Sequence, residues 1–130
     1  MAEKQKKILV VEDDITMREI VEHKLTTSGF TVVTADNGPT AIELWKKEKP
    51  DLVLLDLMLP EMDGFQILET IRKDPETAET PVIVLSNLFS KEDVQKAKGL
   101  KIDEFMIKAY YTTEEILTKI DEVLKKKAIT

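Results

Sequence analysis

Residues 8–14 read Ile-Leu-Val-Val-Glu-Asp-Asp, so four apolar residues are followed at once by three acidic ones. A similar stretch, residues 52–56, reads Leu-Val-Leu-Leu-Asp. Continuous apolar runs of this length are typical of strands buried on both faces of a parallel sheet. A third run of this kind predicts a strand at residues 82–85. Weaker patterns predict two more strands, at residues 31–34 and 104–107.

Segments with apolar residues at helical spacing lie between and after these strands. The expected helices contain the residues Met17 to Leu25, Ala41 to Trp45, Phe65 to Ile71, Val94 to Ala97, and Ile116 to Leu124. Strands that alternate with helices, joined by right-handed crossovers, predict a doubly wound α/β fold with a parallel sheet. The helix at 90–98 offers only Val94 and Ala97 to a core, so we expect it to be the least firmly packed.

Composition excludes several classes of function. The chain has 130 residues, 19 Lys and Arg against 25 Asp and Glu, and a net charge of −6, which suits one globular domain and argues against nucleic-acid binding. It has no cysteine, so disulfides, thiolate catalysis and Cys-type metal sites are excluded. Its single histidine, His23, excludes a multi-histidine metal site and is expected to be exposed. No apolar run approaches the roughly 18 residues of a membrane helix, and a cytoplasmic location is expected.

Polar residues stand where four of the expected strands end. They are Glu12 and Asp13 after the first strand, Asp56 after the third, Ser86 after the fourth, and Lys108 after the fifth. In an open parallel sheet, ligands bind at the carboxyl ends of the strands. Clustered carboxylates repel unless a cation lies among them, and oxygen ligands without sulfur or histidine select Mg²⁺ or Mn²⁺. Because a hydroxyl and an ammonium group suit phosphoryl oxygens, these residues predict a site that accepts a phosphoryl group.

The same residues fall within four short motifs. In chain order these are residues 10–14 (Val-Val-Glu-Asp-Asp), 56–64 (Asp-Leu-Met-Leu-Pro-Glu-Met-Asp-Gly), 85–87 (Leu-Ser-Asn) and 105–108 (Phe-Met-Ile-Lys). Together they resemble the receiver domain of two-component response regulators, over nearly the whole chain. The resemblance implies a flavodoxin-like receiver fold with five helices and the strand order 2-1-3-4-5. It also implies a single receiver domain at residues 1–130, with a core at about 7–126, in a stand-alone, chemotaxis-type architecture.

The resemblance gives each site residue a role. Asp56 is the implied phosphoacceptor, Ser86 and Lys108 are implied to assist the transfer, and Ser86 and Phe105 form the implied switch pair. For Phe105, ordinary core packing is an equally good interpretation. The implied ligands of Mg²⁺ or Mn²⁺ are Glu12, Asp13, Asp56 and the backbone carbonyl of Met58. Asp14 could be a further ligand, but a role at the start of the first helix is favoured.

The resemblance also implies partners. A histidine kinase or a phosphotransfer protein is the implied donor, and a downstream protein target is expected to dock on the face formed by the elements at 90–98, 104–107 and 113–124. Tyr110 and Tyr111 are candidate anchors for that target, although Tyr110 could instead pack as core. Neither a membrane nor nucleic acid is expected as a partner, and no enzymatic activity is expected beyond self-phosphorylation and self-dephosphorylation. Because no output domain follows residue 127, we expect either a stand-alone receiver or a fragment of a longer regulator.

Two positions depart from the family pattern, and two other functions remain open. Ala109 follows Lys108 where the family usually has proline after a cis bond, and we expect a trans bond because a cis non-proline bond costs about 2.5–4 kcal/mol. Asn87 stands where a small residue is usual, and its bulk is expected to restrict access to Asp56. The other functions are a metal-dependent phosphohydrolase, for which Met58 stands where a second aspartate is usual, and a receiver-like module that no longer takes phosphate.

Overall fold

A computed structural model of the chain describes residues 5–88 and 90–129. Over these residues, five parallel strands form one sheet in the order β2-β1-β3-β4-β5. The strands are β1 (Lys7–Val11), β2 (Thr31–Ala35), β3 (Leu52–Leu55), β4 (Val82–Ser86) and β5 (Glu104–Ile107). The doubly wound parallel sheet and its strand order are therefore confirmed.

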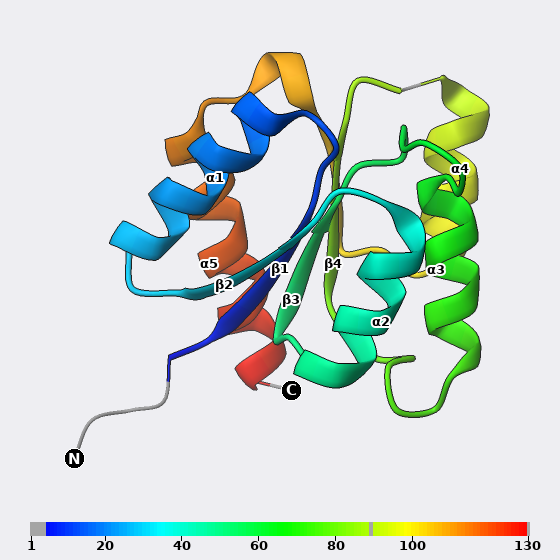
Figure 1. The fold of residues 1–130 in the computed structure, drawn as a ribbon, viewed down its shortest axis with the longest axis horizontal. Helices are drawn as coiled ribbons and strands as arrows, with labels where there is room; N and C mark the ends of the chain where they lie inside the picture. The colour runs from blue at the N-terminus through cyan, green and yellow to red at the C-terminus, as the bar shows by residue number, and fades with distance from the viewer. Residues whose placement is uncertain (1–4, 89, 130) are drawn as a thin grey trace.

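Helices cover both faces of this sheet. They are α1 (Ile15–Thr27), α2 (Gly38–Glu48), α3 (Gly64–Lys73), α4 (Lys91–Gly99) and α5 (Thr113–Ile129), with a short 3₁₀ turn, η1 (Lys108–Tyr110), before α5. Figure 1 shows α1 and α5 on one face of the sheet and α2, α3 and α4 on the other. The edge at which the strands end therefore stays open between two layers of helices.

Each strand contributes to two hydrophobic cores, because successive side chains point to opposite faces of the sheet. On the α1 and α5 face, Val10 and Leu54 pack in one cluster with Ile120. On the other face, Val11 packs in a second cluster with Trp45, which is fully buried. Burial on both sides explains why the runs at residues 8–11, 52–55 and 82–85 in the central strands are apolar at every position.

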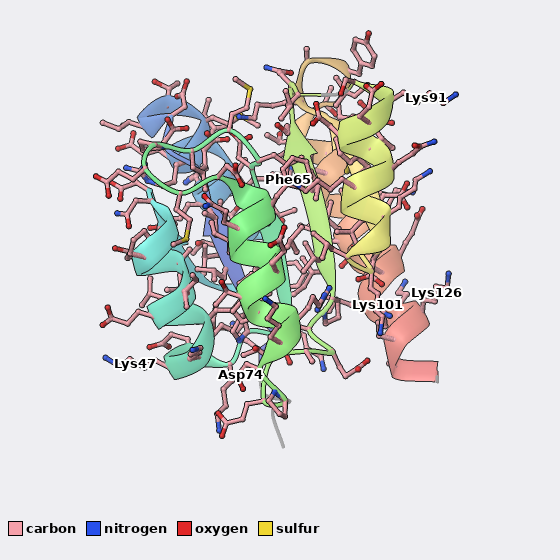
Figure 2. All side chains as sticks on the ribbon, turned by 90° about the vertical axis from the view of Figure 1, so that its right-hand side faces the viewer. Lys47, Phe65, Asp74, Lys91, Lys101 and Lys126 are labelled. Atoms are coloured by element: carbon pink, nitrogen blue, oxygen red, sulfur yellow. The ribbon has the colours of Figure 1, made fainter. Side chains whose placement is uncertain are left out.

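Helix α4 is the most weakly attached, as predicted. Of its residues Lys91–Gly99, only Ala97 is buried. Lys96 adds a contact to α3, since its Nζ lies 4.5 Å from the centroid of the Phe65 ring. Figure 2 shows α4 beside α3, with Phe65 near the upper end of α3. A helix held by so few buried side chains can shift at low free-energy cost.

The start of α1 decides the interpretation of Asp14. Asp14 caps α1 by accepting a hydrogen bond from the backbone N–H of Met17, so its position is that of a helix cap, as favoured. Asp63 caps α3 in the same way, with Gln66 completing a capping box. His23 is exposed, as expected. Within the described residues, no helix combines the length and apolar character that crossing a membrane would require.

Candidate functional site

The carboxyl ends of β1, β3, β4 and β5 meet at one edge of the sheet. The backbone N–H of Asp56 donates to the Val11 carbonyl at 3.1 Å, so the residue after β3 is tied to the end of β1. Ser86 pairs with Ile107 in the β4–β5 ladder, which places Ser86 beside the residue that precedes Lys108. Parallel register thus assembles the polar residues that the sequence placed at the strand ends.

Lys108 bridges two carboxylates at this edge. Its Nζ lies 2.6 Å from Oε1 of Glu12 and 2.7 Å from Oδ2 of Asp56. The side chains of both acids are 5% exposed and that of Lys108 is 17% exposed. Charged groups that are buried in this way need an oppositely charged partner nearby, and Glu12, Asp56 and Lys108 each have one.

Burial and pairing shift the pKa values of Glu12 and Lys108. Burial raises the pKa of Glu12 above its ordinary value, because desolvation outweighs the hydrogen bond from Lys108. For Lys108, burial acts to lower the pKa, but the hydrogen bonds to Asp56 and Glu12 outweigh it and raise the pKa. The ammonium group therefore stays charged at neutral pH and holds the two acids together.

The Asp56 carboxylate is fixed on both of its oxygens. Oδ1 accepts the backbone N–H of Met58 at 3.0 Å, and Oδ2 accepts the ammonium group of Lys108. The loop that follows is closed by the N–H of Gly64, which donates to the Leu57 carbonyl at 3.0 Å. Asp56 as a whole is 4% exposed, so its carboxylate is held in a defined orientation below the rim of the site.

Gly64 makes this close approach possible. A Cβ at this position would lie 2.7 Å from Cα of Leu57 and 2.8 Å from the carbonyl oxygen of Asp56. Both are backbone atoms that cannot rotate away, so we expect Gly64→Ala to displace the Asp56 loop and to cost about 1–3 kcal/mol of unfolding free energy. Gly99→Ala is the matched control, because a Cβ there meets nothing within 4 Å. Urea unfolding checks this, and equal stability of the two variants would contradict the tight packing under Asp56.

Three carboxylates at this edge can hold a metal ion. Glu12, Asp13 and Asp56 each offer an oxygen, and these oxygens lie within 4.8 Å of one another. Asp13 is exposed, whereas the other two are buried. Three acids against the single ammonium of Lys108 leave an excess of negative charge, and hard oxygen donors suit Mg²⁺ or Mn²⁺. The predicted residues therefore fit a divalent cation. Met58, the expected carbonyl ligand, contacts Asp56 through its N–H.

The two predicted switch residues lie in different surroundings. Ser86 is fully buried at the sheet edge, and its Oγ accepts the N–H of Leu88 at 3.2 Å. Phe105 lies three residues before Lys108, pairs with Val84 in the ladder, and is half-buried against the α2–α4 core. It is not part of the acidic cluster. It also lines a groove of about 420 Å³ between α4 and β5. The Phe105 ring therefore packs against the core and also contacts this surface groove.

A contact that the sequence did not predict joins the two loops beside the site. Oδ1 of Asn87 accepts the backbone N–H of Ala109 at 3.0 Å. The Lys108–Ala109 bond is trans, as predicted. The sequence does carry a signal for this contact, because Asn87 and Ala109 are the two departures from the family pattern and each directly follows a site residue. Tyr110 is 67% exposed, so its alternative interpretation as a core residue is wrong.

Comparison with known proteins identifies the family. A family model of the response regulator receiver domain matches residues 8–121. The chain belongs to the response regulator receiver family. This receiver is 36% identical over 128 residues to "Probable transcriptional regulator ycf27" of Porphyra purpurea, covering 97% of the chain and 50% of that protein. It is 32% identical over 120 residues to the cell cycle response regulator CtrA of Brucella ovis, covering 92% of the chain and 50% of CtrA.

Solved structures agree with this family assignment. The chemotaxis protein CheY4 of Vibrio cholerae is 28% identical, with a TM-score of 0.86, and the match covers 92% of this chain and 99% of CheY4. A CheY-like receiver domain protein of Methanospirillum hungatei has a TM-score of 0.90 at 25% identity, covering 96% and 98% of the two chains. The receiver spans about half the length of the curated relatives it matches. It is similar in extent to the two CheY-like structures.

Proposed function

We propose that this receiver takes a phosphoryl group on Asp56 from a histidine kinase or a phosphotransfer protein, with Mg²⁺ or Mn²⁺ held by the neighbouring carboxylates. The observation that supports this most strongly is the Asp56 carboxylate itself, which is paired with the ammonium group of Lys108 and lies within 4.8 Å of carboxylate oxygens of Glu12 and Asp13. An acceptor of a phosphoryl anion needs positive charge positioned beforehand at the place where the anion arrives. Lys108 supplies part of that charge, and the acidic cluster provides a place for a cation.

The chain's own residues have distinct tasks in the transfer. A carboxylate oxygen of Asp56 forms a bond to phosphorus while the bond from phosphorus to the donor nitrogen breaks, and its electron pair returns to the donor's imidazole. The ammonium group of Lys108 then pairs with a phosphoryl oxygen instead of the free carboxylate. The buried hydroxyl of Ser86 turns its proton toward another phosphoryl oxygen. Glu12, Asp13, Asp56 and the Met58 carbonyl would hold the cation, which would supply neutralisation of the incoming charge when bound.

We propose that Ser86 and Phe105 carry the phosphorylated state to a protein target that docks on the face formed by α4, β5 and α5. The groove between α4 and β5 supports this face, because Phe105 forms part of its wall and a change in the Phe105 side chain would alter the surface directly. Tyr111, 40% exposed, stands with Tyr110 between β5 and α5 and adds aromatic surface of the kind that anchors interfaces. The few buried side chains of α4 would let this face change shape.

We propose further that residues 1–130 form a single receiver domain with its core at about 7–126, and that it acts in the cytoplasm. We propose that it turns over no external substrate and does not contact nucleic acid directly, since its net charge is −6. A phosphohydrolase is disfavoured because Met58, where such enzymes usually carry a second aspartate, has no carboxylate. The buried and paired acids disfavour a module that has lost its phosphoacceptor.

Phosphorylation from a small donor tests the proposed function. We expect acetyl phosphate with Mg²⁺ to add one phosphoryl group to the protein, and a chelator to reduce the initial rate by at least about tenfold, since the transfer depends on charge neutralisation. Intact mass spectrometry at short times measures both. No gain in mass with Mg²⁺, or the same rate with chelator, would refute a metal-dependent phosphoacceptor.

A further inference from the structure

The hydrogen bond between Asn87 and Ala109 connects the two loops that carry the reactive groups. Asn87 directly follows Ser86 at the end of β4, and Ala109 directly follows Lys108 in η1. The bond from the Ala109 N–H to Oδ1 of Asn87 is 3.0 Å long and spans 22 residues of sequence. Each partner is therefore one residue away from a side chain that we assign to phosphoryl transfer.

This bond fixes the backbone on the far side of Lys108. On the near side, Ile107 is held to Ser86 by the β4–β5 ladder. On the far side, the peptide unit between Lys108 and Ala109 is held by the Asn87 side chain. With Ile107 paired to β4 and the peptide unit after Lys108 bonded to Asn87, the backbone of Lys108 is restrained on both sides, and its ammonium group is directed at Glu12 and Asp56.

The bond depends on the two residue types present. A backbone N–H at 109 exists only because this residue is not proline, and an acceptor exists at 87 only because the side chain carries a carbonyl oxygen. Both residues are exposed, so water competes for these groups and the bond adds little to the stability of the fold. Its effect is expected on the position of Lys108.

We infer that Asn87 is a positioning residue, which holds Lys108 over the acidic cluster through the N–H of Ala109 and thereby speeds phosphoryl transfer to Asp56. The inference rests on the proposed function for its effect on rate. It predicts that Asn87 speeds phosphoryl transfer, whereas the expectation from bulk is that Asn87 slows the transfer by hindering access to Asp56. If bulk dominated, a smaller residue at 87 would speed the transfer, whereas loss of positioning slows it.

Three measurements on Asn87→Ala test this inference. We expect the initial rate of Mg²⁺-dependent phosphorylation by acetyl phosphate to fall roughly three- to tenfold, the range that corresponds to the loss of one net hydrogen bond. Amide exchange of Ala109, followed by NMR, should speed up by a similar factor. The ε-methylene resonance of Lys108 should move toward that of an exposed lysine, while the urea midpoint falls by no more than the loss of one net hydrogen bond.

Asn87→Asp is the matched control, because it keeps an acceptor oxygen at the same place, and it should retain the slow exchange of Ala109. Phosphorylation of Asn87→Ala at the wild-type rate or faster, or an unmoved Lys108 resonance, would overturn the inference. Unchanged exchange of Ala109 in Asn87→Ala would overturn it as well. A wild type that takes up no phosphoryl group would refute the proposed function instead, and the Lys108 resonance and the Ala109 exchange would still decide whether Asn87 positions Lys108.

Discussion

Replacing Asp56 with asparagine abolishes the uptake of phosphoryl from acetyl phosphate, to below the detection limit of intact mass spectrometry. The amide is a far weaker nucleophile than the carboxylate that Asp56 presents to phosphorus. The fold should persist, because the amide oxygen can still accept the N–H of Met58 that Oδ1 accepts in the wild type. Circular dichroism and the urea midpoint establish that Asp56→Asn is folded before its labelling is compared with that of the wild type.

Asp63→Asn is the matched control for this result. Asp63 lies at the start of α3 and caps it by accepting the N–H of Gln66 at 3.0 Å, a role that asparagine fills equally well. The control has the same chemical change in the same loop and should be phosphorylated like the wild type. Labelling of Asp56→Asn at the rate of Asp63→Asn would show that the phosphoacceptor lies elsewhere.

Lys108→Met should be the most destabilising single change at the site when metal is absent. It leaves Glu12 and Asp56, each with a side chain 5% exposed, without the cation that joins them. Removing one partner from such a buried set costs about 3–5 kcal/mol, because the remaining charges are left uncompensated. The pKa of Lys108 is raised in the folded protein, so the charged side chain contributes its full stabilisation of the fold at any pH below the ordinary lysine pKa. At neutral pH, Lys108→Met loses this stabilisation entirely. Urea unfolding in the presence of a chelator measures this loss.

Mg²⁺ provides the internal check on that interpretation. A divalent cation on Glu12, Asp13 and Asp56 would compensate the charge that Lys108 no longer balances, so Mg²⁺ should raise the melting temperature of Lys108→Met more than that of the wild type. Lys98→Met, an exposed change on α4, should lie within about 0.5 kcal/mol of the wild type. Equal stability of Lys108→Met and Lys98→Met in chelator would contradict the account of the ion pairs.

The strands were predictable because burial on two faces leaves a strong local signal. The run at 8–11 and that at 82–85 each match their strand to within one residue. The two strands predicted from weaker patterns also match: β5 spans the predicted residues 104–107, and β2 is one residue longer than the predicted 31–34. Other contacts leave no periodic trace in the sequence: the Arg72 guanidinium donates to the carbonyls of Ala78 and Thr80 in the loop that follows α3.

The sequence predicts which residues form the site, but it does not predict all of the contacts between them. Parallel register alone brings the residues after β1, β3 and β5 to one edge, so the cluster of Glu12, Asp56 and Lys108 follows from the position of each at a strand end. The hydrogen bond from Ala109 to Asn87 depends on the conformation of two loops. No residue pattern fixes that conformation, and so the role of Asn87 required the structure.

The central claim is that Asp56 carries the phosphoryl group, and reductive trapping tests it most directly. Borohydride reduces an acyl phosphate to the alcohol, so a phosphorylated aspartate becomes homoserine and its position can be read by peptide mass spectrometry. After treatment with acetyl phosphate and Mg²⁺, we predict homoserine at position 56, with Asp13 and Asp63 unchanged. Homoserine at another aspartate, or a phosphorylated protein in which position 56 is still aspartate after reduction, would contradict the account.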